Sequence, residues 1–143
     1  MKIGIFGTGM VGRTLAGKIM ETGHEVMIGT RNVETTLART EPDGQGNPPI
    51  GTWLESRPEI RLGTFRETAE ESELLLNATA GTGSLEALKA AGEKQLAGKI
   101  LVDVSNPLDF SEGFPPILTV CNTDSLGEQI QRAYPDLKVV KTL

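Results

Sequence analysis

The sequence predicts an α/β protein in which helices cover both faces of a doubly wound parallel β-sheet. Two observations lead to this prediction. Short apolar runs alternate with amphipathic stretches along most of the chain, and the first such pair is joined by a glycine-rich turn. Six strands connected mainly by helices favour a parallel sheet, because successive parallel strands need crossover connections.

The chain begins with a predicted strand at residues 2–6 and a helix that starts at Met10, with the sequence GTGMVG between them. The helix is expected to end at Gly23, and its spacing places Arg13 on the solvent side. A G-x-G-x-x-G turn in this context is the dinucleotide-binding fingerprint of the Rossmann fold, although a glycine-rich turn that binds nothing is the alternative. The cofactor-binding residues predicted from this turn are Gly7, Thr8, Gly9, Met10, Val11 and Gly12.

The remaining elements follow in alternation as far as the C-terminus. Residues 41–58 hold four of the eight prolines, so we expect an irregular insertion there, with Trp53 holding it to the body. Thr64 is a candidate helix cap, and a polar loop is expected at residues 107–123. The predicted strands are residues 25–29, 59–63, 73–79, 99–104 and 137–140, and the predicted helices are residues 32–38, 66–73, 84–91 and 125–133.

Composition indicates a single domain over residues 1–143 and excludes several classes of function. The net charge is −5 without any basic cluster, which argues against nucleic acid or an anionic membrane as partner. No apolar run is long enough to span a bilayer, and the first helix is too charged for a signal peptide. A single cysteine, Cys121, suits the cytoplasm, and no metal-binding motif occurs. We therefore expect a cytoplasmic protein with small-molecule partners and no metal site.

The end of the second predicted strand indicates which dinucleotide binds. An NAD site places an acid there to hold the ribose 2′-hydroxyl. This chain has Thr30 and Arg31 instead, followed by Asn32. An arginine can hold the 2′-phosphate of NADP with its planar fork, whereas the alternative is an ordinary solvated charge. The sequence therefore favours NADP over NAD.

Ligands of such sheets bind beyond the carboxyl ends of the strands. The fourth predicted strand ends at Asn77, Ala78 and Thr79, and the fifth is followed by Asn106 and Pro107. We expect these residues to line the cofactor site.

Five segments together are similar to one known family. They are GIFGTGMVGRTLAGKI, GHEVMIGTRN, ELLLNATAGTGSLEAL, KILVDVSNPLDF and VVKTL, and they cover essentially the whole chain. In these segments the sequence resembles the coenzyme F420-dependent NADP oxidoreductases. The resemblance implies hydride exchange between NADP(H) and the deazaflavin F420, with residues 8–11 on the pyrophosphate and residues 30–31 on the 2′-phosphate. Residues 77–79 and 106–107 would then lie near the nicotinamide.

Two departures from the family pattern affect this expectation. Members of the family continue past the VVK strand into a helical part that encloses the deazaflavin and forms a dimer, whereas this chain stops at Leu143. We therefore expect either a truncated homo-oligomeric enzyme or a stand-alone nucleotide-binding module. The second departure is in the segment that follows the fourth predicted strand. In the family this segment has the pattern TxPW, whereas here it reads TAGTGS.

No catalytic side chain is predicted, because direct hydride transfer needs two rings held at close range and no nucleophile. His24, Cys121 and Asp103 are interpreted as structural or inert. The alternatives that remain open are an NADPH-dependent reductase with another acceptor and a non-catalytic module that binds NADP(H) or senses redox state.

Overall fold

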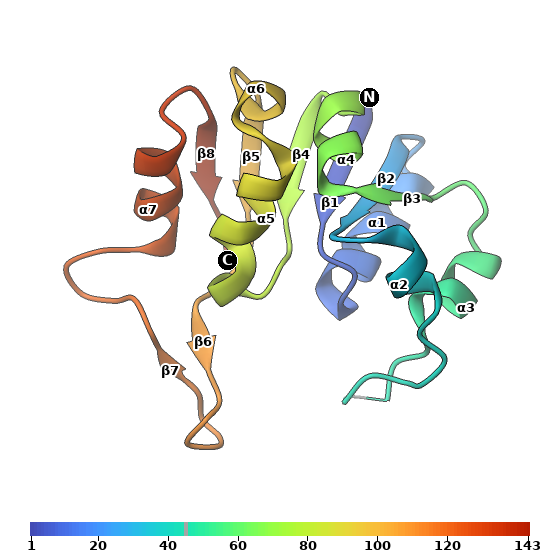
Figure 1. The fold of residues 1–143 in the computed structure, drawn as a ribbon, viewed down its shortest axis with the longest axis horizontal. Helices are drawn as coiled ribbons and strands as arrows, with labels where there is room; N and C mark the ends of the chain where they lie inside the picture. The colour runs from blue at the N-terminus through green and yellow to red at the C-terminus, as the bar shows by residue number, and fades with distance from the viewer. Residues whose placement is uncertain (45) are drawn as a thin grey trace.

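The computed structural model describes residues 1–44 and 46–143, and it contains a six-stranded parallel sheet (Figure 1). The strand order is β3-β2-β1-β4-β5-β8, so β1 lies in the middle, where the direction of strand addition reverses. This order is that of the Rossmann fold and confirms the predicted fold class. The strands are β1 Lys2–Phe6, β2 Glu25–Thr30, β3 Arg61–Thr64, β4 Leu74–Asn77, β5 Ile100–Asp103 and β8 Lys138–Lys141.

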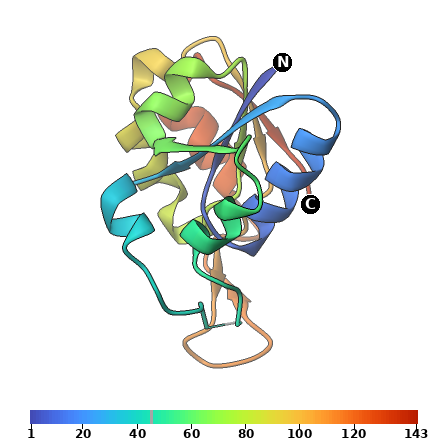
Figure 2. The same cartoon turned by 90° about the vertical axis from the view of Figure 1, so that its right-hand side faces the viewer.

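Helices cover both faces of this sheet (Figure 2). Successive strand residues point to opposite faces, so Ile5 and Ile28 pack with Ala16 of α1 and Ile50 of α3. Phe6, Leu75 and Leu101 pack on the other face against α4, α5, α6 and α7. None of the helices in residues 1–44 and 46–143 combines the length and apolar character needed to cross a bilayer. The helices are α1 Met10–Glu21, α2 Val33–Leu37, α3 Ile50–Glu55, α4 Phe65–Glu71, α5 Ser84–Ala91, α6 Glu93–Leu96 and α7 Leu126–Ala133, with a 3₁₀ turn η1 at Gly81–Gly83.

The start of α4 is fixed by the cap that the sequence predicts. The Thr64 hydroxyl accepts from the Glu67 amide, while the Glu67 carboxylate accepts from the Thr64 amide at 2.7 Å. These two bonds satisfy amides that would otherwise lack partners at the helix end. The bonds that the Glu67 carboxylate accepts from the Thr64 amide and, at 2.9 Å, from the Thr64 hydroxyl lower the pKa of Glu67.

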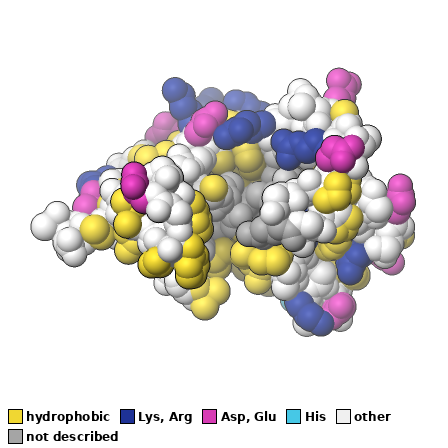
Figure 3. Space-filling model, turned by 90° about the horizontal axis from the view of Figure 1, so that it is seen from below, with side chains coloured by type: hydrophobic (Ala, Val, Ile, Leu, Met, Phe, Trp, Pro, Cys, Tyr) yellow, Lys and Arg dark blue, Asp and Glu magenta, His cyan; other side chains and the backbone are white. Residues whose placement is uncertain are grey.

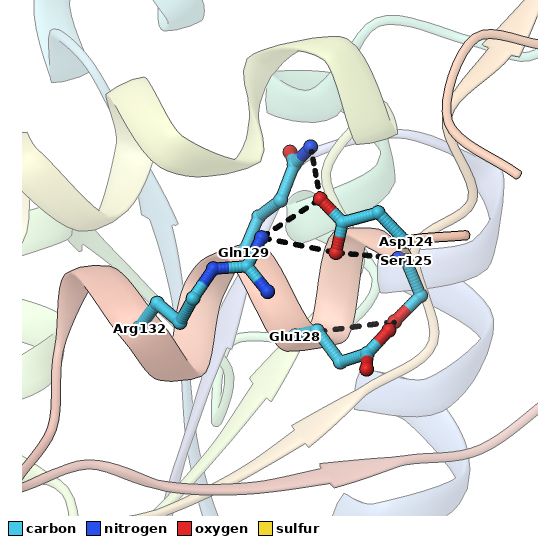
Figure 4. Close-up of polar contacts among 5 residues, drawn as sticks. All are labelled: Asp124, Ser125, Glu128, Gln129 and Arg132. Atoms are coloured by element: carbon cyan, nitrogen blue, oxygen red, sulfur yellow. Dashed lines mark hydrogen bonds and ion pairs between the residues drawn. The ribbon is translucent and has the colours of Figure 1, made fainter.

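A second polar cluster fixes the start of α7, where the chain returns to the sheet (Figure 4). Ser125 caps the helix by accepting from the Glu128 amide. The Asp124 carboxylate accepts two bonds from Arg132, at 3.0 and 2.7 Å, and one from Gln129. The Arg132 guanidinium lowers the pKa of Asp124. The cluster therefore sets where α7 begins and so how β8 reaches the edge of the sheet.

The structure differs from the sequence prediction in four places, the first of which is the short helix α6, which was not predicted. The stretch expected to be irregular, residues 41–58, contains α3, while its residue 45 lies outside the described residues. The expected loop at 107–123 contains an antiparallel hairpin of two short strands, β6 Leu108–Asp109 and β7 Ile117–Leu118. Arg13 is only 9% exposed and does not lie on the solvent side. Trp53, by contrast, packs beside the core cluster under α1, with the Arg57 guanidinium 4.5 Å from its ring.

Gly12 of α1 packs tightly against the turn that follows β1. A Cβ atom added there would lie 2.2 Å from the carbonyl oxygen of Gly7, a separation that real atoms do not adopt. Gly17, in the same helix, has room, since an added Cβ would lie 3.8 Å from Arg57.

We therefore expect Gly12→Ala to destabilise the fold and Gly17→Ala to stabilise it. Overpacking at Gly12 should lower the free energy of unfolding by about 1–3 kcal/mol, or roughly 5–10 °C in Tm. Removing a glycine from a helix interior should add about 0.5–1 kcal/mol at Gly17. Thermal denaturation followed by circular dichroism measures both. Equal Tm values for the two variants would show that α1 does not depend on this contact.

Candidate functional site

A cavity of about 580 Å³ opens at the carboxyl ends of the strands. This end of the sheet is the lower end in Figure 1, and Figure 3 looks directly onto it. Hydrophobic side chains gather on this face, and Lys and Arg side chains lie along one border with Asp and Glu side chains among them. The cavity is lined by the glycine loop, by the segments that follow β4 and β5, by the β6–β7 hairpin, and by Asp43 and Gly44.

The three glycines of the loop have different surroundings. Gly7 has a φ of +114°, which other residues rarely adopt, and an added Cβ would lie 2.5 Å from the carbonyl oxygen of Ala78. Gly12 allows the close contact with Gly7 described above. At Gly9 no described atom lies within 4 Å of the position a Cβ would take. Gly9, Met10 and Val11 line the cavity, so the backbone at Gly9 is open to a ligand.

The residues predicted for the 2′-phosphate lie at the end of β2, outside the cavity lining. The Thr30 hydroxyl is buried and lies 2.8 Å from the Thr36 hydroxyl. Asn32 caps α2 by accepting from the Thr35 amide at 2.8 Å. Arg31 is well exposed, and its guanidinium lies 3.3 Å from the Glu86 carboxylate on α5. Of the three side chains, Arg31 is the one free to reach a ligand.

Asn77 lies at the carboxyl end of β4, but its side chain is fully buried and does not face the cavity. Its register partner on β5 is Asp103. The Asn77 amide donates to Ser84, Asp103 and Ser105 at 2.9, 3.0 and 3.1 Å, and its oxygen accepts from the Thr79 hydroxyl at 2.7 Å. Asp103 Oδ1 also accepts from the Ser105 hydroxyl at 2.6 Å, while Oδ2 has no hydrogen-bond partner among the described residues. This polar cluster joins the ends of β4 and β5 beneath the site.

The segments after β4 and β5 touch each other directly above that cluster. The Gly81 amide donates to the Asn106 carbonyl at 3.2 Å, and a Cβ on Gly81 would lie 2.3 Å from that carbonyl group. Ala78, Thr79 and Asn106 line the cavity as the strand ends predict. Pro107 does not; its carbonyl accepts from the Thr119 amide and so closes the base of the hairpin.

Sequence reasoning missed several residues that line the cavity. Leu108 and Phe110 come from the hairpin, whose two-residue strands leave no periodic pattern. Asp43 and Gly44 come from the insertion, where an Asp-Gly pair signals only a turn. Val104 was missed as well. Ala80, Gly81 and Ser105, by contrast, lie in the segments that follow β4 and β5, where the sequence predicts that a ligand binds.

His24, Cys121 and Tyr134 are ionisable residues that do not line the cavity. The His24 imidazole is 3.3 Å from the N-terminal amine, beside the start of β2. Cys121 is exposed. Tyr134 packs against the core, and its burial raises the pKa of the phenol. Among residues 1–44 and 46–143, no three His, Cys, Asp or Glu side chains are grouped so that they could bind a metal ion.

Comparison with known proteins places this site in a family. Residues 2–107 match the family described as NADP oxidoreductase, coenzyme F420-dependent. A crystal structure from Arthrobacter sp. FB24, provisionally assigned as an F420-dependent NADP reductase, superposes with a TM-score of 0.92 at 57% identity. The superposition includes 99% of this chain and 61% of the Arthrobacter chain.

Two further relatives are more distant. Metalloreductase STEAP3 of Rattus norvegicus is 32% identical over 140 residues, which are 98% of this chain and 24% of that protein. An imine reductase from Aspergillus terreus, solved with NADPH4, matches in fold alone, with a TM-score of 0.63 at 17% identity over 98% of this chain and 39% of that one.

The chain thus spans about three-fifths of the Arthrobacter protein and a quarter of the rat protein. The span it shares with them is the sheet and the glycine loop, which form a Rossmann NAD(P)-binding domain. The chain belongs to the family of F420-dependent NADP oxidoreductases.

Proposed function

We propose that this domain binds NADP(H) along the carboxyl edge of the sheet and exchanges a hydride between it and a deazaflavin of the F420 type. The observation that carries the proposal is the open backbone at Gly9, which lines a cavity and leaves unfilled the space a side chain would take. A dinucleotide pyrophosphate fits such a cradle, because the first turn of α1 offers unpaired amides and a partial positive charge.

The other end of the dinucleotide would lie at Arg31. Its side chain is 69% exposed and sits at the end of β2, which is the strand neighbouring β1. A guanidinium can make two parallel hydrogen bonds to a phosphate, which a ribose hydroxyl cannot match. Thr30 and Asn32 would contribute backbone groups, since their side chains already have partners.

The nicotinamide would then lie near Ala78, Thr79 and Asn106. NADPH supplies the hydride, so the protein has to hold the two rings at reactive distance and exclude water. Leu108 and Phe110 of the hairpin give this end of the cavity an apolar wall. The family membership supports F420 as the acceptor.

A second candidate keeps NADPH as the donor and changes the acceptor to a flavin or a metal chelate. The 32% identity to a protein named metalloreductase favours it. Steady-state oxidation of NADPH with F420, FMN and a ferric chelate as separate acceptors distinguishes the two. Binding of NADPH without oxidation by any acceptor would instead support a non-catalytic module.

Gly9→Val should abolish NADPH binding and leave the fold intact. The backbone at Gly9 has φ −74° and ψ −179°, which valine adopts readily, and its side chain would extend into open space. Titration of NADPH fluorescence measures binding, and Gly9→Ala provides a smaller step at the same position. Unchanged affinity in the valine variant would remove the glycine loop from the proposed site.

Arg31→Ala should weaken NADPH binding by roughly ten- to a hundredfold and leave NADH binding almost unchanged. A hydrogen bond to a charged group contributes about 1.5–3 kcal/mol, and NADH lacks the phosphate that would accept it. Glu86→Gln is the matched control, because it removes the ion pair but keeps the guanidinium. Equal losses for both cofactors would mean that Arg31 acts through the fold.

Turnover with F420 should be very slow for residues 1–143 alone, although NADPH binding should lie in the micromolar range. The Arthrobacter relative has a further part that this chain does not span, and we propose that such a part covers the acceptor. Loss of positioning can reduce a rate by several orders of magnitude. Fusing the corresponding part of that relative should raise kcat sharply. Fast turnover without it would show that this domain holds both ring systems unaided.

A further inference from the structure

Arg13 is a buried cation, one turn into α1, that lies between two segments of the site. Its Nε donates to the carbonyl of Thr8 in the glycine loop at 2.7 Å. Its Nη1 donates to the carbonyl of Pro48, which is 35 residues away in the insertion. The side chain therefore connects the glycine loop to the segment that precedes α3.

A charge in this position is costly, which argues for a specific role. Burial lowers the pKa of Arg13, and the nearby carboxylate of Asp43 acts in the opposite direction. Apolar packing alone would be served better by a methionine or leucine, because a buried charge must be compensated by hydrogen bonds. Here the compensation comes from two backbone carbonyls, which the guanidinium reaches with two different nitrogens.

The segment that Arg13 contacts is held together by hydrogen bonds between Asp43 and Asn47. The Asp43 amide donates to the Asn47 carbonyl at 3.0 Å, and the Asn47 amide donates back to the Asp43 carboxylate at 2.9 Å. The Asn47 side chain donates to both carboxylate oxygens, at 3.1 and 2.9 Å. Asp43 and Gly44 line the same cavity as Gly9, Met10 and Val11. Figures 1 and 2 show the chain on either side of residue 45 extending beyond the carboxyl ends of the strands.

We propose that Arg13 is a positioning residue of the dinucleotide site, which fixes the carbonyl of Thr8 and, through the carbonyl of Pro48, holds Asp43 and Gly44 in the wall of the cavity. The inference rests on the proposed NADP(H) function. The proposal makes Asp43 and Gly44 of the insertion part of the binding site. The glycine fingerprint, by contrast, covers only residues 7–12. Because Arg13 acts on the loop and not on the 2′-phosphate, NADPH and NADH should depend on it equally.

The test compares Arg13→Met, Arg13→Lys and the control Arg57→Met. Fluorescence titrations give the Kd for NADPH and for NADH at a temperature well below unfolding. We expect Arg13→Met to weaken both cofactors about tenfold, the effect of one lost hydrogen bond from a charged donor. Arg13→Lys should recover part of the lost affinity, because an ammonium can still donate a hydrogen bond to one of the two carbonyls. Arg57, which lies over Trp53 and outside the cofactor cavity, should change neither Kd by more than about twofold.

A second readout needs no ligand. Trypsin can cut after the exposed Arg39, at the start of the segment, and release of the Pro48 carbonyl should speed this cut severalfold in Arg13→Met. If that variant does not fold, the affinities of Arg13→Lys and Asn47→Ala test the proposal instead. Asn47→Ala removes the hydrogen bonds from the Asn47 side chain to the Asp43 carboxylate while Arg13 stays in place. Wild-type affinity in both would overturn the proposal.

The outcomes separate the inference from the function on which it rests. If the parent chain does not bind NADPH, the proposed function and the inference both fail. If the parent binds and Arg13→Met binds equally well, with an unchanged rate of cutting after Arg39, only the inference fails. A loss confined to NADPH would also overturn it, because that result would assign Arg13 to the 2′-phosphate.

Discussion

The architecture of the site depends on how closely α1 approaches β1. With hydrogen as the side chain of Gly12, the helix is separated from the strand by three residues, and Met10 and Val11 of its first turn line the cavity. The same turn brings Gly7 against the carbonyl of Ala78, so the loops that follow β1 and β4 are in contact. A larger residue at Gly7 or Gly12 would separate these elements and widen the cavity. One packing constraint thus determines both the buried centre of the sheet and the place where a dinucleotide can approach the backbone.

A buried polar cluster supports the opposite side of the cavity. Parallel pairing places Asn77 beside Asp103, and their side chains meet under the N-terminus of α5. Buried polar groups stabilise a structure only when their hydrogen bonds are made, and here Ser84, Ser105 and Thr79 complete most of them. The cluster fixes the directions in which the chain leaves β4 and β5, which is why Gly81 and Asn106 meet above it. The polar side chains at these two strand ends therefore shape the site from below, while the backbone of the same segments lines it.

Most of the fold could be predicted from the sequence because its signals are local. Apolar runs placed all six strands of the sheet to within about two residues, and Thr64 and Ser125 marked helix starts that the structure confirms.

The predictions that failed have a different origin. The proline content of residues 41–58 concealed the short helix α3, and the hairpin strands are too short to show alternation. Helical spacing alone placed Arg13 in solvent, since nothing local indicates that Pro48 returns to cover it. Residue types at strand ends predicted the position of the site, whereas the direction of the Asn77 side chain depended on partners from two other elements.

The charge distribution bears on how such a site can hold a phosphate-bearing ligand. The chain has a net charge of −5, so its overall field repels an anionic dinucleotide. Attraction must therefore be short-range, from the amides at the start of α1 and from Arg31.

The guanidinium of Arg31 is paired with Glu86, but both side chains are 69% exposed, and an exposed pair of this kind contributes little to stability. A phosphate can replace the carboxylate at small cost, because the guanidinium would exchange one anionic acceptor for another. The pair thus keeps Arg31 extended toward α5 without opposing its transfer to a ligand, and the discrimination between NADP and NAD would come from a side chain that stability does not require.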